Sequence, residues 1–277
     1  MARAVGEPLG RVLGQPMLFD YKPGANSQIA VDMVAKAAPD GYTLTTVIAA
    51  HSANPSLYPK MPFDAQHDIV PVALTGVAPL ILVANASFPP NNVAELVAYA
   101  KARPGQLNFG SSGKGAAAHL AMEAFMSAHG LKMQHVPYKG TQPALTDLIG
   151  GQIQLLFDVP LSMVQHVKAG KIKSFGVASE KRLPGYPDLN TFAEGGVPFI
   201  ANTWSMILAP AKTPKEIVAR LNAESNKILA SAAVREKLES TGVVPGSGSP
   251  EDAAAFLASE IARNAKVIKD AGVKLDN

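Results

Sequence analysis

Apolar positions along the chain switch repeatedly between two patterns. Short runs rich in Val, Ile and Leu are typical of buried strands, and between them apolar residues recur every three or four positions, as on one face of a helix. We predict strands at residues 17–19, 42–50, 72–74, 80–83, 107–110, 133–136, 152–157, 172–178 and 204–208. We predict helices at residues 5–13, 27–38, 93–102, 116–129, 142–149, 161–168 and 250–271, and one that starts after residue 213. This alternation indicates an α/β fold built in layers. Between residues 116 and 178, strands and helices recur at the spacing of a parallel sheet.

Residues typical of helix N-termini mark where several of these helices begin. Asn92 is a typical N-cap, and the tetrapeptides 213–216 and 249–252 each combine a hydroxyl cap, a proline at the first helical position and an acid at the third. We expect a turn at residues 23–26. Residues 51–71 are rich in Pro, Asn and Asp, so we expect them to be mostly loop.

Composition limits the function more than the fold. The 277 residues are 47% hydrophobic, carry a net charge of +3 and include no cysteine. The absence of cysteine excludes thiol catalysis, disulfides and cysteine-ligated metal. The small, scattered positive charge does not indicate nucleic-acid binding. We expect no metal site, because the six histidines lie far apart in the sequence without paired carboxylates. No apolar run is long enough to cross a membrane, and the first residues do not resemble a signal peptide.

The segment Leu107-Asn108-Phe109-Gly110-Ser111-Ser112-Gly113-Lys114-Gly115 carries the clearest functional signal. A short strand leads into a Gly/Ser loop that opens directly onto a helix beginning near Ala116. Backbone N–H groups and the positive end of the helix dipole at such a junction suit an anion. We expect the N–H groups of residues 113–116, with the hydroxyls of Ser111 and Ser112, to supply the donors. The alternative interpretation is an ordinary glycine-rich turn.

Known catalytic and nucleotide-binding motifs do not fit this loop. A phosphate-binding P-loop would need a lysine directly after Gly115, where Ala116 stands. The loose dinucleotide fingerprint has no acid near His135 to bind a ribose. Neither serine has the flanking glycines of a hydrolase nucleophile. The loop is therefore interpreted as a binding element and not as a catalytic one.

Polar residues at the ends of other predicted strands could converge with the loop, because ligands of open α/β sheets bind outside the carboxyl ends of strands. These residues are His51, Ser52, Asn54, Tyr138, Lys139, Thr141 and Asp158. Asp158 could accept a hydrogen bond from a ligand amino or hydroxyl group, or cap a helix if the ligand is only an anion. Each of the others could instead be a solvated loop side chain. His119 and His166 are expected to be structural, and Trp204 to lie in the core.

Several segments, in consistent order and spacing, resemble the Bug family of periplasmic solute receptors, the substrate-binding components of tripartite tricarboxylate transporters. They are the Gly/Ser loop and residues 37–44, 54–58, 136–140, 144–151, 208–211, 213–214 and 220–222. The resemblance implies a two-lobed, type II periplasmic-binding-protein fold with two crossings between the lobes. We expect residues 1–105 and 204–277 to form the first lobe and residues 106–203 the second.

The resemblance further implies a monomeric, periplasmic receptor that has no catalytic residues or cofactor and passes a small carboxylate to a membrane permease. Its ligands would be di- or tricarboxylates, amino acids or aromatic acids. The residues implied in binding are Gly110, Ser111, Ser112, Gly113, Lys114, Gly115, Ala116, His51, Ser52, Tyr138 and Asp158. A carboxylate sensor that signals through a membrane partner and, less favoured, a phosphate- or nucleotide-dependent enzyme are the alternatives.

This chain departs from the family pattern at a few positions. Ala116 stands where a hydroxyl residue is common, Lys114 where a neutral residue is common, and Val159 where Asn is frequent. Family members also carry a signal peptide, a first strand and a Pro/Gly-rich ligand loop before the helix at which this sequence begins. We expect these segments to be missing here, as in a truncated copy or a start assigned at an internal methionine, which would weaken ligand binding.

Overall fold

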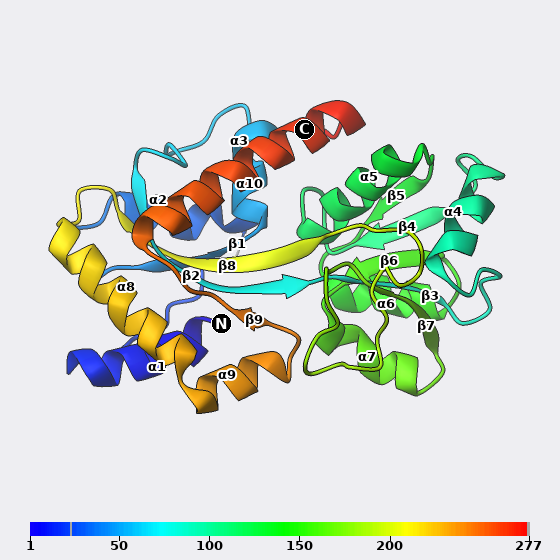
Figure 1. The fold of residues 1–277 in the computed structure, drawn as a ribbon. Helices are drawn as coiled ribbons and strands as arrows, with labels where there is room; N and C mark the ends of the chain where they lie inside the picture. The colour runs from blue at the N-terminus through cyan, green and yellow to red at the C-terminus, as the bar shows by residue number, and fades with distance from the viewer. Residues whose placement is uncertain (23, 276–277) are drawn as a thin grey trace.

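The computed structural model describes residues 1–22 and 24–275, which fold into two α/β lobes joined by two crossing strands (Figure 1). The strands are β1 Thr45–Ile48, β2 Ile69–Pro79, β3 Ile81–Asn85, β4 Asn108–Ser111, β5 Gln134–Pro137, β6 Leu155–Asp158, β7 Ile172–Val177, β8 Asn202–Pro210 and β9 Val244–Pro245. The helices are α1 Ala2–Leu13, η1 Ala25–Ser27, α2 Gln28–Ala35, α3 Ala50–Leu57, α4 Val93–Lys101, α5 Ala117–His129, α6 Thr141–Ile149, α7 Pro160–Lys168, α8 Lys215–Ala230, α9 Ala232–Glu239 and α10 Pro250–Ala271. Pro23, part of the turn predicted at 23–26, lies outside the described residues.

Each lobe is built on one sheet. The first-lobe sheet has the order β1-β8-β2-β9 and is antiparallel throughout. The second-lobe sheet has the order β5-β4-β6-β3-β7, in which β5, β4 and β6 are parallel and β3 is antiparallel to both of its neighbours. The parallel spacing predicted for residues 116–178 is confirmed for β5 and β6, which are both parallel to β4, and β7 runs in the same direction on the far side of β3. The strand predicted at 17–19 does not form.

Alternating side chains of one strand give the first lobe its two apolar layers. On β8, Met206 and Leu208 pack with the cluster that includes Val31 of α2 and Leu257 of α10. Ile207 lies in the opposite cluster, with residues of α1 and α8. The sheet is therefore covered on both faces, which buries β8 almost completely.

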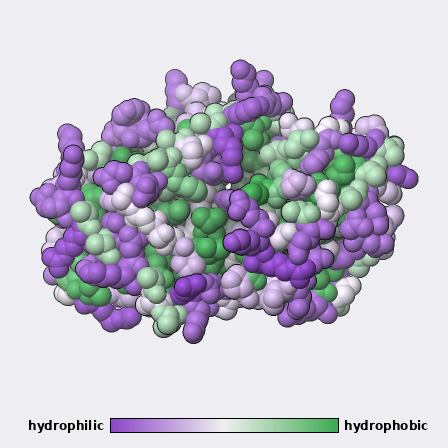
Figure 2. Space-filling model, in the orientation of Figure 1, coloured by the Kyte–Doolittle hydropathy of each residue, from purple (hydrophilic) through white to green (hydrophobic). Residues whose placement is uncertain are grey.

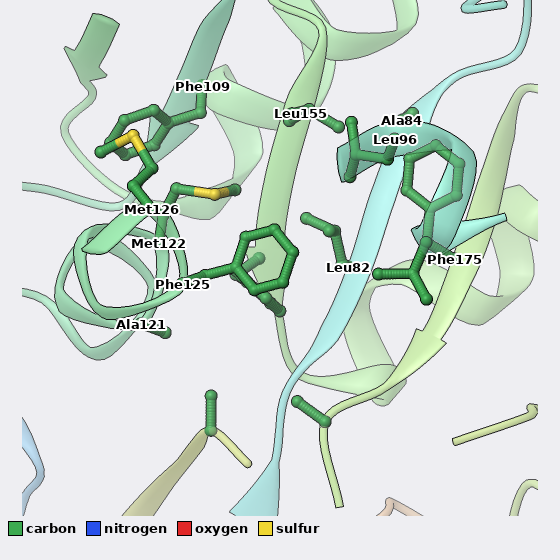
Figure 3. Close-up of a cluster of buried hydrophobic side chains, with 14 of the residues drawn as sticks. Leu82, Ala84, Leu96, Phe109, Ala121, Met122, Phe125, Met126, Leu155 and Phe175 are labelled. Atoms are coloured by element: carbon green, nitrogen blue, oxygen red, sulfur yellow. The ribbon is translucent and has the colours of Figure 1, made fainter. Parts of the chain in front are cut away.

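The same alternation organises the second lobe. Leu82 of β3 faces the layer made by α4 and α5, whereas residues 81 and 83 face the layer made by α6 and α7. Figure 3 shows Phe125 and Met122 of α5 pointing toward Leu155 and Leu82 of the sheet. These rings and thioethers fix α5 against β4 and β6, and α5 is the helix that follows the Gly/Ser loop.

The crossings between the lobes lie at residues 80 and 201. Leu80 N–H donates to Ala201 O (2.9 Å), and Ala178 N–H donates to Leu80 O (2.8 Å), so the crossing segments are hydrogen-bonded to each other and to the end of β7. The first lobe boundary predicted at residue 105 was wrong, because β3 and α4 belong to the second lobe. The second boundary, predicted at 204, falls next to the crossing at 201.

Helix α3 includes residues 51–57, which were expected to be loop because residues 51–71 are rich in Pro, Asn and Asp. Most of α3 is buried, and it packs with α10. Burial of this face outweighs the unfavourable helix propensity of the sequence. The long helix α10 contacts α3 in the first lobe and α5 in the second, and in Figure 1 it runs along one side of the first lobe toward α5. In Figure 2, hydrophilic residues cover most of the outer surface, with hydrophobic patches visible between the lobes.

Candidate functional site

The Gly/Ser loop joins β4 to α5, as the sequence predicts. Gly113 (φ 148°) and Gly115 (φ 77°) adopt backbone conformations that favour glycine. Helix α5 begins at Ala117 without a side-chain cap, so the N–H groups of its first turn have no acceptor within the helix. The loop therefore places a helix N-terminus at the end of the strand, where an anion can accept these hydrogen bonds.

Several loop groups that were expected to donate to a ligand are used within the protein. Ser111 is fully buried, and its Oγ donates to Gly113 O (2.9 Å) and accepts from Gly113 N–H (3.2 Å). Gly115 N–H donates to Nδ1 of His119 (3.1 Å), and Ala116 N–H donates to Gly113 O (3.2 Å). These bonds correct the expectation for Ser111 and for the amides of residues 113, 115 and 116: they shape the loop. Ser112 and Lys114 remain partly exposed.

The loop after β5 is hydrogen-bonded to the Gly/Ser loop. Tyr138 N–H donates to Ser111 O (3.0 Å), and Gly140 N–H donates to Ser112 O (3.1 Å). The Tyr138 ring lies beside Gly110, where a β-carbon would stand 3.3 Å from ring atom Cε2. The structure therefore brings two of the predicted loops together as one unit.

The side chain of Tyr138 makes a hydrogen bond within the protein. Its hydroxyl donates to the carboxylate of Asp147 in α6 (2.7 Å). Burial, followed by this hydrogen bond, raises the pKa of Tyr138 to about 12. The phenol therefore stays protonated at neutral pH, and its hydrogen bond to Asp147 connects the loop after β5 to α6. The backbone N–H of Tyr138 bonds to the Gly/Ser loop.

Asp158 links the third strand end to this unit. Its two carboxylate oxygens accept from the hydroxyl of Thr141 (2.7 Å) and from Val159 N–H (2.7 Å), at the N-termini of α6 and α7. Burial raises the pKa of Asp158, and these two hydrogen bonds oppose that rise. Neither contact caps a helix, because one partner is the Thr141 hydroxyl and the other is the N–H of Val159, the residue before α7; Asp158 joins the starts of α6 and α7.

Three helix N-termini meet at this edge of the sheet. Because β5, β4 and β6 are parallel and adjacent, the helices that follow them, α6, α5 and α7, all begin at the same end of the strands. In none of these three helices does the N-cap residue itself supply a side-chain cap hydrogen bond. Their dipoles make the edge electropositive, and Lys114 adds a cation to the loop. An anion held here would be stabilised without any catalytic group.

His51 and Ser52 lie on α3, where both are fully buried. Ser52 Oγ donates to Ala49 O (2.7 Å) and accepts from Nδ2 of Asn264 (2.8 Å), which ties α3 to α10. His51 stacks on Phe63, and burial lowers its pKa to about 4, so the imidazole is neutral. Neither ring nitrogen has a hydrogen-bond partner among the described residues.

Residues that the sequence did not single out form the first-lobe side of the site. A β-carbon on Gly115 would stand 2.3 Å from Leu57 Cδ1 and 3.5 Å from Asn26 Nδ2, so both side chains lie against the loop. Asn26 belongs to three consecutive non-glycine residues with positive φ, Ala25, Asn26 and Ser27. Such backbone is strained, and strain of this kind gathers at functional sites. In the sequence, the only sign of this backbone conformation is the pair Asn26-Ser27, which follows Gly24 and Ala25.

The acidic and histidine side chains were also compared with the groupings that bind metal ions. Across residues 1–22 and 24–275, no three His, Asp or Glu side chains are grouped so as to hold a metal ion. Among the same residues, no helix is long and apolar enough to span a membrane. What the edge offers is a set of oriented N–H donors and a positive potential.

Comparison with known proteins supports this interpretation. Residues 1–273 match the model of the tripartite tricarboxylate transporter family receptor. The chain is 35% identical over 278 residues to the protein BugT of Bordetella pertussis, covering 99% of this chain and 85% of that one.

Solved structures agree in fold. A protein of R. palustris, determined with adipate, superimposes with a TM-score of 0.88 at 36% identity, covering 99% of this chain and 93% of the other. The protein MatC of Rhodopseudomonas palustris, with bound malate, gives a TM-score of 0.82 at 32% identity, with 96% and 92% covered. The expected two-lobed, periplasmic-binding-protein-like α/β fold is thus confirmed. The chain belongs to the tripartite tricarboxylate transporter receptor family and is a solute-binding protein, not an enzyme.

Proposed function

We propose that this protein captures a small dicarboxylate between its lobes, outside the cytoplasm, and delivers it as a monomer to the membrane permease of a tripartite tricarboxylate transporter. One observation carries the proposal: the N-termini of α5, α6 and α7 meet around the Gly/Ser loop. This is the arrangement that backbone chemistry favours for a carboxylate.

One ligand carboxylate would bind at the start of α5. The amides of its first turn and the partly exposed hydroxyl of Ser112 are the donors, and the side chain of Lys114 supplies opposite charge. When ionised, Asp158, which lies beside α6 and α7, repels a second carboxylate placed against it. The second carboxylate of the ligand would therefore lie away from Asp158.

Two relatives support an aliphatic dicarboxylate as the ligand class. The two solved relatives described above were determined with adipate and malate, which differ in length but share two terminal carboxylates. Both relatives share about a third of their residues with this chain over almost its full length. Adipate and malate are thus the first ligands to test.

Lobe closure would couple binding to transport. Leu57 of α3 and Asn26 of η1 lie against Gly115 of the second lobe. On the other side of the cleft, Gly185 of the second lobe approaches the backbone of Glu239 in the first, where a β-carbon would stand 2.1 Å from Glu239 O. A ligand that binds these surfaces together favours the closed form by its differential affinity, and the permease would recognise that form.

A thermal-shift and calorimetric screen tests the binding step. At about 100 times its Kd, a ligand raises stability by about 2.7 kcal/mol, which is readily detected as a rise in Tm. We expect malate or adipate to shift the Tm and acetate to shift it less. A shift produced only by phosphate or nucleotides would refute the proposal. Uptake into proteoliposomes that contain a tripartite permease, with and without this protein, tests delivery.

A further inference from the structure

Two histidines stack face to face directly beneath the Gly/Ser loop. The ring of His119, from α5, lies 3.7 Å from that of His135, from β5, with an angle of 12° between the planes. Phe109 of β4 stacks on His135 at 5.0 Å. His119 is 3% exposed, whereas His135 is partly exposed. The sequence predicted a purely structural role for His119.

The hydrogen bonds of His119 specify one tautomer. Gly115 N–H donates to Nδ1 (3.1 Å), and an amide N–H can only donate, so Nδ1 carries the lone pair. The ring proton is then on Nε2, which lies 3.3 Å from Oε1 of Glu123. His119 thus accepts from the loop on one side and has the Glu123 carboxylate of its own helix on the other.

His135 holds the opposite end of the loop. Its Nε2 lies 2.7 Å from Oγ of Ser111. If Nε2–H donates to Ser111, the serine uses both lone pairs and its proton, because it also accepts from Gly113 N–H and donates to Gly113 O. Burial, then the charges of His119 and Lys114, lower the pKa of His135 to about 3. The ring therefore stays neutral at physiological pH.

The histidine pair reaches both ends of the ligand loop, at Ser111 and Gly115. Building on the carboxylate-binding function proposed above, we propose that His119 and His135 are positioning residues: they hold the loop so that the first turn of α5 faces the ligand.

Two substitutions separate the acceptor from the ring. His119→Asn keeps an acceptor oxygen near the position of Nδ1 but loses the stack, whereas His119→Phe keeps the stack on His135 but loses the acceptor. Calorimetry with malate and adipate at pH 7.5 should show about tenfold weaker binding for His119→Phe, the effect of one lost hydrogen bond, and at most about threefold for His119→Asn. Equal binding by wild type and His119→Phe, or a larger loss for His119→Asn, would overturn the proposal.

A ligand-free measurement distinguishes failure of this inference from failure of the proposed function. In the wild type, ¹⁵N NMR should find the His119 proton on Nε2, and amide hydrogen exchange at Gly115 should be slow. Exchange should quicken in His119→Phe and not in His119→Asn. If the wild type binds no carboxylate but these results hold, the positioning role stands and the ligand class is wrong. A proton found on Nδ1 overturns the positioning role whether or not the variants fold.

Discussion

Leu57 of α3 occupies the space beside Gly115 of the Gly/Ser loop, so closely that a β-carbon on Gly115 would stand 2.3 Å from Leu57 Cδ1. The two residues belong to different lobes, and Leu57 is almost completely buried. The contact therefore exists only while the lobes are together, and the lack of a side chain at position 115 is what permits it.

Replacing Gly115 by alanine should disfavour closure and weaken ligand binding by tenfold or more. Alanine would add about 1–2 kcal/mol of backbone strain at φ 77° and, in addition, a collision with Leu57. Leu57→Ala in the same chain removes the collision and leaves the strain. Calorimetric Kd values for the wild type, both single variants and the double variant form a cycle in which the double variant should bind better than additivity predicts. Additive losses would show that Leu57 does not limit closure.

Substituting Gly113 with valine should abolish carboxylate binding while the fold persists. A β-carbon there would meet only the carbonyl oxygen of Tyr138, at 3.6 Å, but φ is 148°, so the loop must change shape. Gly130→Val is a matched control, because Gly130 also has positive φ (64°) and open space, at the far end of α5. Both variants should lose about 1–3 kcal/mol of stability in urea unfolding. Only Gly113→Val should lose binding in calorimetry, and retained affinity in that variant would exclude the loop from the site.

Asp158→Asn should become more stable relative to the wild type as the pH rises from 4 to 7. Burial raises the pKa of Asp158, so the folded protein holds this proton more tightly than the unfolded chain. The stability from the protonated group is complete below the unfolded pKa and is lost as pH rises through the folded pKa. An asparagine can accept from Val159 N–H through its oxygen and donate to Thr141 through its nitrogen, without the charge.

The measurement is the difference in Tm between Asp158→Asn and the wild type at several pH values. The Tm of Asp158→Asn minus the Tm of the wild type should increase as the pH rises. A constant difference, or one that moves the other way, would mean that the hydrogen bonds of the carboxylate outweigh its burial.

Local signals in the sequence predicted local structure well. The Ser249 capping box forms, with Ser249 Oγ accepting from Asp252 N–H and the Asp252 carboxylate accepting from Ser249 N–H, and Asn92 caps α4. Thr213 fails as a cap: α8 begins only at Lys215, and the buried Thr213 hydroxyl has no partner among the described residues. A capping pattern is therefore sufficient only when the chain before the helix leaves the cap residue in reach of the third helical amide.

Long-range relationships were not accessible from the sequence. The Gly/Ser loop was found because glycine, serine and a helix start are adjacent in the chain. The crossing at Leu80 was missed because β2 and β3 form an almost continuous apolar run, and only pairing of β3 with β6 and β7 shows that it has entered the second lobe. The bond from His135 to Ser111 joins residues 24 positions apart, and neither residue carries a local sign of it.

Glu260 accepts a hydrogen bond from the indole N–H of Trp204, the only tryptophan in the sequence. The indole Nε1–H of the buried Trp204 donates to Oε2 of Glu260 (2.8 Å), which also accepts from Arg263 on the same helix (2.7 Å). Glu260→Leu would leave the indole N–H buried without an acceptor at a cost of about 1–3 kcal/mol, whereas Glu260→Gln keeps an amide oxygen in its place. Urea unfolding followed by the fluorescence of Trp204 should therefore rank the wild type and Glu260→Gln close together and Glu260→Leu well below both. Because Arg263 is partly exposed, loss of its ion pair alone should cost at most about 1 kcal/mol. If Glu260→Gln were as unstable as Glu260→Leu, the charge of Glu260 and not the hydrogen bond to Trp204 would hold α10 on the first-lobe sheet.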